Sequence, residues 1–63
     1  MAKTKAEQDV IIVIYRRNGE RVTRARGEER RLRLWRGRWV RGGYIARQID
    51  TAGIVKEFGS EEA

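Results

Sequence analysis

The first sharp hydrophobic feature of the chain is VIIVIY at residues 10–15, a run of six β-branched or aromatic residues with charged residues on both sides. Such runs are typical of strands. Asn18-Gly19 follows, the dipeptide best suited to a tight hairpin turn, and residues 20–26 then predict a second strand. In a two-residue loop Val13 would face Arg24 across the hairpin.

Residues 30–41, RRLRLWRGRWVR, begin with arginine and leucine in alternation. This alternation predicts a strand over 30–36, a break at Gly37 and a further strand over 38–41. Gly42 and Gly43 would form a bend or bulge, and residues 44–49 predict another strand. The loop at Gly37 allows two registers, and in each of them one tryptophan lies with the arginines while the other lies with the leucines or in the turn.

The C-terminal stretch DTAGIVKEFG fits two elements. One is a turn followed by a strand over 54–58; the other is a short helix with Asp50 as its N-cap. The strand is favoured, because Gly53 would cost a helix about 1 kcal/mol relative to alanine.

These elements predict an all-β fold, with a short C-terminal helix as the alternative ending. Five to six short strands in a single domain over residues 10–58 would form a small, strongly bent antiparallel sheet or a barrel of the SH3-like or OB-like size class. Residues 1–9 are expected to be a flexible polar tail, and residues 59–63 a frayed acidic tail.

The VIIVIY strand is apolar on both of its faces. Val10, Ile12 and Ile14 point one way, and Ile11, Val13 and Tyr15 point the other. A chain of 63 residues has little material for a second covering layer. We therefore expect a homodimer, with Ile11, Val13 and Tyr15 at the oligomer interface.

Composition and charge limit the classes of function that the chain is expected to have. The net charge is +6, and all twelve arginines lie between residues 10 and 55 together with only four acidic residues, which favours an anionic partner. The absence of His and Cys excludes disulfides and the usual ligands of structural zinc, and with no nucleophile beside a base we expect neither catalysis nor a cofactor. No apolar run is long enough to cross a membrane, and the first residues lack the apolar core of a secretory signal, so a cytoplasmic protein is expected.

Arginines interleaved with tryptophans suit nucleic acid, because guanidinium groups contact phosphates and a flat ring can stack on a base. The sequence therefore predicts a non-catalytic DNA- or RNA-binding protein whose main contacts come from the arginine/tryptophan segment. A protein module or inhibitor that binds an acidic partner surface, and an oligomeric structural protein, are the alternatives. The predicted nucleic-acid-binding residues are Arg24, Arg26, Arg31, Arg33, Trp35, Arg36, Arg38, Trp39, Arg41 and Arg47.

Overall fold

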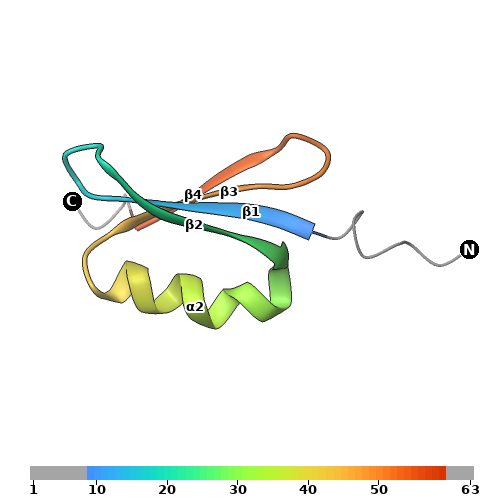
Figure 1. Ribbon diagram of the computed structural model, residues 1–63, viewed down its shortest axis with the longest axis horizontal. Coiled ribbons are helices and arrows are strands. Elements are labelled where there is room, and N and C mark those ends of the chain that lie inside the picture. The colour runs from blue at the N-terminus through green and yellow to red at the C-terminus, as the bar shows by residue number, and fades with distance from the viewer. Residues whose placement is uncertain (1–8, 60–63) are drawn as a thin grey trace, which may run out of the picture.

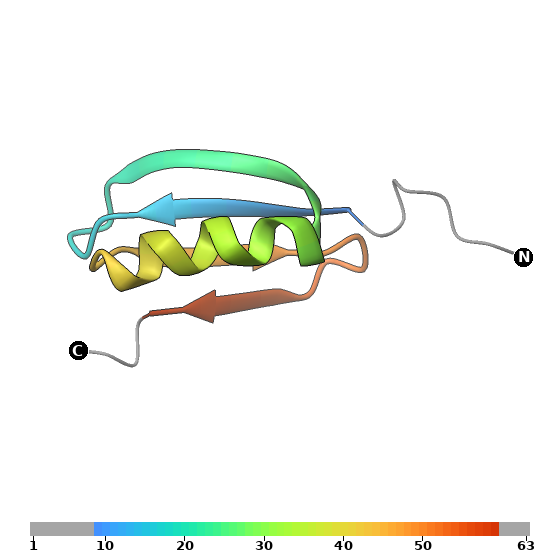
Figure 2. The ribbon, with the colours of Figure 1, turned by 90° about the horizontal axis from the view of Figure 1, so that it is seen from below.

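A computed structural model describes residues 9–59. It shows one four-stranded antiparallel sheet with one helix packed on one of its faces (Figures 1 and 2). The strands lie in the order β2-β1-β3-β4. The elements are β1 (Asp9–Tyr15), β2 (Arg21–Glu28), α2 (Glu29–Arg41), β3 (Ile45–Ile49) and β4 (Val55–Phe58).

The first hairpin forms as expected, with a longer turn. Val13 pairs with Arg24, as the sequence predicts. The connection between the strands spans residues 16–20, however, and the register shifts between Ile14 and Tyr15. The backbone N–H of Arg16 donates to the carbonyl of Glu20 at 2.8 Å, so the turn closes one residue earlier on the β1 side than a two-residue loop would.

Residues 29–41 form a helix, and the prediction of two strands separated at Gly37 is wrong. Leu32, Trp35, Arg36, Trp39 and Val40 follow the spacing i, i+3, i+4, i+7, i+8, which places them along one side of a helix. The arginine–leucine alternation covers too few residues to outweigh this helical period. In addition, residues 29–39 contain no β-branched residue that would favour a strand. Because Leu34 does not fit the helical period, it is 66% exposed.

The glycine pair at 42–43 ends this helix and does not bend a sheet. The N–H of Gly42 donates to the carbonyls of Arg38 and Trp39, and the N–H of Gly43 donates to that of Val40. Glu29 lies in the first turn and two arginines lie in the last, so the end charges oppose the helix dipole favourably. Within residues 9–59, the only helix is this one of thirteen residues, and it is neither long nor apolar enough to cross a bilayer.

The sheet is open, with four strands, and the expected barrel of five to six strands is not formed. The residues of two expected strands, 30–36 and 38–41, belong to α2, so too few strands remain to close a barrel. The C-terminal stretch is a strand, as favoured, and not a helix. Gly59, which was expected to belong to the frayed tail, follows β4 directly and is buried. Residues 1–8 and 60–63 of the two expected tails lie outside the described residues.

The core lies between α2 and the sheet. Its fully enclosed part contains Val10, Ile12, Ile14 and Ala46, and the helix packs Leu32, Trp35, Trp39 and Val40 against it. These strand residues alternate with Ile11, Val13 and Tyr15, which lie on the opposite face of the sheet. No segment of residues 9–59 covers that second face (Figure 1).

Candidate nucleic-acid interface

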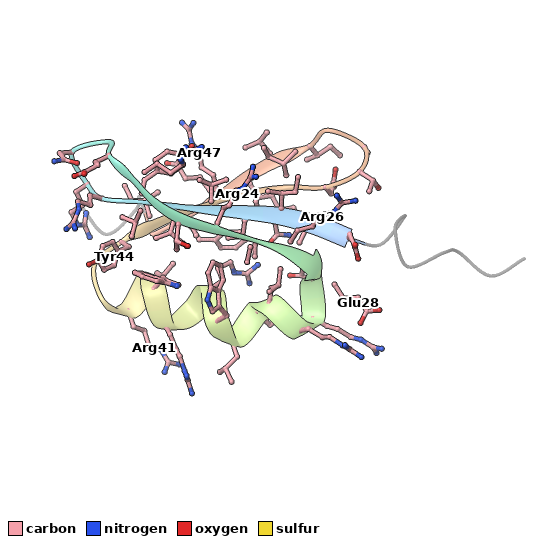
Figure 3. All side chains as sticks on the ribbon, viewed as in Figure 1. Arg24, Arg26, Glu28, Arg41, Tyr44 and Arg47 are labelled. Carbon is pink, nitrogen blue, oxygen red and sulfur yellow. The ribbon has the colours of Figure 1, made fainter. Side chains whose placement is uncertain are left out.

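The structure divides the predicted nucleic-acid-binding residues among three places. Arg24, Arg26 and Arg47 lie on the sheet face that points away from the helix, and Arg41 points away from the sheet on the other side of the molecule (Figure 3). Arg31, Arg33 and Arg38 are also exposed on α2. Trp35, Arg36 and Trp39 lie between the helix and the sheet. The ten residues therefore do not form one surface.

Both tryptophans pack against the core. Their rings meet edge to face with centroids 6.2 Å apart, and Trp39 meets Tyr44 in the same way at 4.9 Å. Because they are four residues apart on a helix, they lie on the same side of it. The expectation that one tryptophan joins the arginines at the surface as a stacking platform is wrong.

Arg36 belongs to the contact between helix and sheet. Its side chain is only 12% exposed, and its guanidinium carbon lies 3.9 Å from the centre of the Phe58 ring. The guanidinium donates to the amide oxygen of Gln48, which is buried, and to Glu29 at 3.3 Å. Arg36 thus satisfies a buried polar side chain in place of reaching solvent.

We expect Arg36→Ala to lower the free energy of unfolding by about 2 to 3 kcal/mol, because it leaves the Gln48 amide oxygen buried without its donor. The matched control is Arg33→Ala. Arg33 also pairs with Glu29, at 3.6 Å, but its side chain is 66% exposed. Its loss should change stability by no more than about 0.5 kcal/mol. Urea unfolding followed by tryptophan fluorescence measures both; equal losses would show that Arg36 contributes only a surface ion pair.

On the sheet face opposite the helix, two of the three arginines have acidic partners. Arg26 lies 3.9 Å from Asp9, and Arg47 donates to Glu57 at 3.1 Å. The hydrogen bond and charge of Glu57 raise the pKa of Arg47 above its usual value. Arg24 has no carboxylate within 4.0 Å among residues 9–59, so this face carries one arginine in excess.

One end of the molecule gathers acidic residues. The start of β1, the end of β2, the start of α2 and the turn between β3 and β4 meet there (Figure 1). We call this the acidic end; its carboxylates are Asp9, Glu28, Glu29 and Asp50. The arginines nearby are paired: Arg30 and Arg31 lie 3.7 and 3.1 Å from Glu28. Positive charge is therefore largely neutralised at the acidic end.

The opposite end gathers arginines. The β1–β2 turn and the last turn of α2 both lie at this end, on opposite sides of the sheet, because α2 runs back along the sheet after β2 (Figures 1 and 2). We call this the basic end and define it as Arg16, Arg17, Arg21, Arg38 and Arg41, with Glu20 as its acidic residue.

Only one arginine of the basic end has an ion-pair partner in the described part of the chain: Arg16 lies 3.2 Å from Glu20. Arg17, Arg21, Arg38 and Arg41 have no carboxylate within 4.0 Å among residues 9–59, and all four are exposed. A hollow of about 260 Å³ adjoins the turn; Arg16, Arg17 and Arg47 line it together with Glu57, the ion-pair partner of Arg47. The local excess of positive charge makes this end the strongest anion-attracting surface among the described residues.

Sequence reasoning left Arg16, Arg17 and Arg21 out of the candidate site. They are far from Arg38 and Arg41 along the chain, and only a helix that returns along the sheet brings the two groups to one end. A count of acidic residues near each arginine would have been a usable signal, since Glu20 is the one acid between Tyr15 and Gly27.

Comparisons with known proteins add no relative: no protein-family model matches the chain, and searches of curated proteins and of solved structures return no match. Among residues 9–59, the acidic side chains form no group of three that could hold a metal ion. The arrangement of charge is therefore the basis for a functional interpretation.

Proposed function

We propose that this chain is a small, non-catalytic nucleic-acid-binding protein that contacts the phosphate backbone through the basic end. The observation that carries the proposal is the group of four exposed arginines, Arg17, Arg21, Arg38 and Arg41, without a carboxylate within 4.0 Å among residues 9–59. Like charges gathered at one end of a small protein repel one another, and a polyanion that contacts several of them reduces that repulsion. A guanidinium group also fits a phosphate with two parallel hydrogen bonds.

Binding of this kind is electrostatic and only weakly selective for sequence. Phosphate contacts position a protein on nucleic acid without reading bases. Both tryptophan rings are partly buried against the core, so we expect phosphate contacts, and not base stacking on these rings, to supply most of the affinity. If the four unpaired arginines of the basic end neutralise about four phosphates on a duplex, the logarithm of the binding constant falls with the logarithm of salt concentration with a slope of about −3.6.

The test is fluorescence anisotropy of labelled duplex DNA, single-stranded DNA and RNA, titrated with the protein at several salt concentrations. Arg38→Gln/Arg41→Gln should weaken duplex binding about tenfold or more and reduce the salt slope from about −3.6 to about −1.8, because two phosphate contacts are lost. Glutamine keeps a good helix former at both positions.

The matched control is Arg30→Gln/Arg31→Gln, which removes the same charge from the same helix at the acidic end. These arginines already pair with Glu28, so the salt slope should stay close to that of the unmodified protein. Equal effects of the two double substitutions would contradict a localised site. If none of the three polymers binds at low salt, the proposal is wrong, and an acidic protein surface becomes the remaining partner for the basic end.

A further inference from the structure

The face of the sheet opposite the helix carries an exposed apolar row. Across the strands, Ile11 of β1 pairs with Arg26 of β2 and with Ile49 of β3, and Ile49 pairs with Val55 of β4. Ile49 is 37% exposed and Val55 is 56% exposed. We call this side of the sheet the open face. Residues 9–59 leave its apolar row without cover.

The next row of the open face is charged at both edges. Val13 pairs with Arg24 on β2 and with Arg47 on β3, and Arg47 pairs with Glu57 on β4. An arginine thus lies at one edge of the sheet and a glutamate at the other. Arg24 is the member of this row that has no carboxylate within 4.0 Å among residues 9–59.

We propose that the open face binds the open face of a second copy of this chain, related by a two-fold axis parallel to the strands. Such an axis reverses the strand order across the interface, so β2 lies over β4 of the partner. Arg24 then faces Glu57 of the partner subunit, and the reverse pair forms by symmetry. In the apolar row, Ile11 faces Ile49 of the partner subunit.

The charges select this axis over the other way of stacking two faces. An axis that runs across the strands keeps the strand order and places β2 over the oppositely directed β2 of the partner, so Arg24 and Arg26 would lie near the same two arginines of the other copy. Like charges that face each other across an interface are destabilising. The axis along the strands replaces that repulsion with two attractive pairs.

A second copy fits the open face better than a polyanion does. Arg26 and Arg47 already pair with Asp9 and Glu57, so the face has little net charge compared with the basic end. Its apolar row, Ile11, Ile49 and Val55, could pack against the apolar row of a second copy. The existing core is small, with four buried apolar residues among residues 9–59, and additional burial would stabilise the fold.

The size of the open face predicts reversible association. Four strands spaced about 4.8 Å apart and about 20 Å long present roughly 400 Å² per copy. This is about half of what a standard stable interface buries on each partner. We therefore expect a dimer with a dissociation constant in the micromolar range, about 10 μM.

Sedimentation equilibrium over about 1 to 300 μM, a range that brackets such a constant, tests the interface. Ile49→Lys, which puts a charge into the apolar row, should raise the dissociation constant at least about tenfold. Leu34→Lys is the matched control: it makes the same change of charge at an exposed apolar residue of the helix and should leave the constant unchanged.

Circular dichroism checks that Ile49→Lys is folded, and Val55→Lys, at a more exposed position of the same row, replaces it if it is not. A wild-type protein that is monomeric over the whole range overturns the proposal, and so does equal weakening by Leu34→Lys.

Cross-linking tests the axis. The chain has no cysteine, so Arg24→Cys and Glu57→Cys can each be made as a single thiol. A bismaleimide that spans about 10 Å, the distance between packed sheets, should link the two variants to each other in a mixture. It should not link Arg24→Cys to itself. Self-linking of Arg24→Cys, or the absence of any mixed product, contradicts the axis along the strands.

Discussion

Gly59→Ala is expected to lower the free energy of unfolding by about 2 to 5 kcal/mol, a large part of the total stability. Gly59 has φ of +94°, a left-handed conformation that costs a residue with a Cβ about 1 to 2 kcal/mol. A Cβ on Gly59 would also lie 2.8 Å from the carbonyl oxygen of Tyr44 and 3.4 Å from Val40 Cγ1. Forcing such a contact into a packed site costs about 1 to 3 kcal/mol more. The close contact joins the end of β4 to the segment after α2, so the basic end would lose its support as well.

Gly43→Ala is the control that separates the two causes. Gly43 has φ of +97°, almost the same as Gly59, but a Cβ there would meet nothing within 4 Å. It should therefore show only the conformational cost of about 1 to 2 kcal/mol. Urea denaturation followed by circular dichroism compares the two. Equal losses would mean that the approach of Gly59 to the Tyr44 carbonyl contributes nothing to stability.

Ile12→Ala should have the second large effect. The Ile12 side chain is 0% exposed, and with Ile14 it is one of the two largest fully buried side chains among residues 9–59. Truncation of a buried isoleucine to alanine costs about 2 to 5 kcal/mol, through lost burial and the cavity that remains. A domain with so small a core has a total stability near the lower end of about 5 to 15 kcal/mol. Urea unfolding should show a mostly unfolded protein or a transition shifted far toward low denaturant.

Ile11→Ala makes the same truncation on the opposite face of β1 and serves as the comparison for Ile12→Ala. At about 1 μM, below the expected dimer constant, Ile11→Ala should cost clearly less than Ile12→Ala, because Ile11 lies on the open face. At concentrations where the dimer forms, the gap should narrow, since Ile11 is then buried against Ile49 of the partner subunit. Identical losses for Ile11→Ala and Ile12→Ala at the lower concentration would contradict a one-sided core.

Several elements were predictable because their signals are local. Six consecutive β-branched or aromatic residues make β1 a strand in almost any surroundings, and Asn18-Gly19 marks the turn after it. The pairing of Val13 with Arg24 agrees with the two-residue loop that was expected, because the register shift between Ile14 and Tyr15 offsets the longer turn. At the C-terminus, Gly53 favoured strand over helix, and β4 is a strand.

The segment 29–41 shows how two periods can compete. Arg31 to Leu34 alternate as in a strand, while Leu32, Trp35, Trp39 and Val40 repeat as in a helix. The longer period prevails because it packs both tryptophans and two aliphatic side chains against the core residues of the sheet, and burial of that apolar surface stabilises the helix in this position. Leu34 fits the strand alternation but not the helical period, and in the helix its side chain is exposed.

The sequence by itself determined the two-sided apolar strand, the excess of arginine and the absence of histidine and cysteine. Only the tertiary structure decided where each arginine lies. Arg36 lies in the helix–sheet contact, where it touches Gln48 and Phe58. Arg17 and Arg21 lie at the same end of the molecule as the last turn of α2, because the helix returns along the sheet. Side-chain chemistry is a property of each residue, whereas proximity between distant residues depends on chain topology, and the basic end is a product of topology.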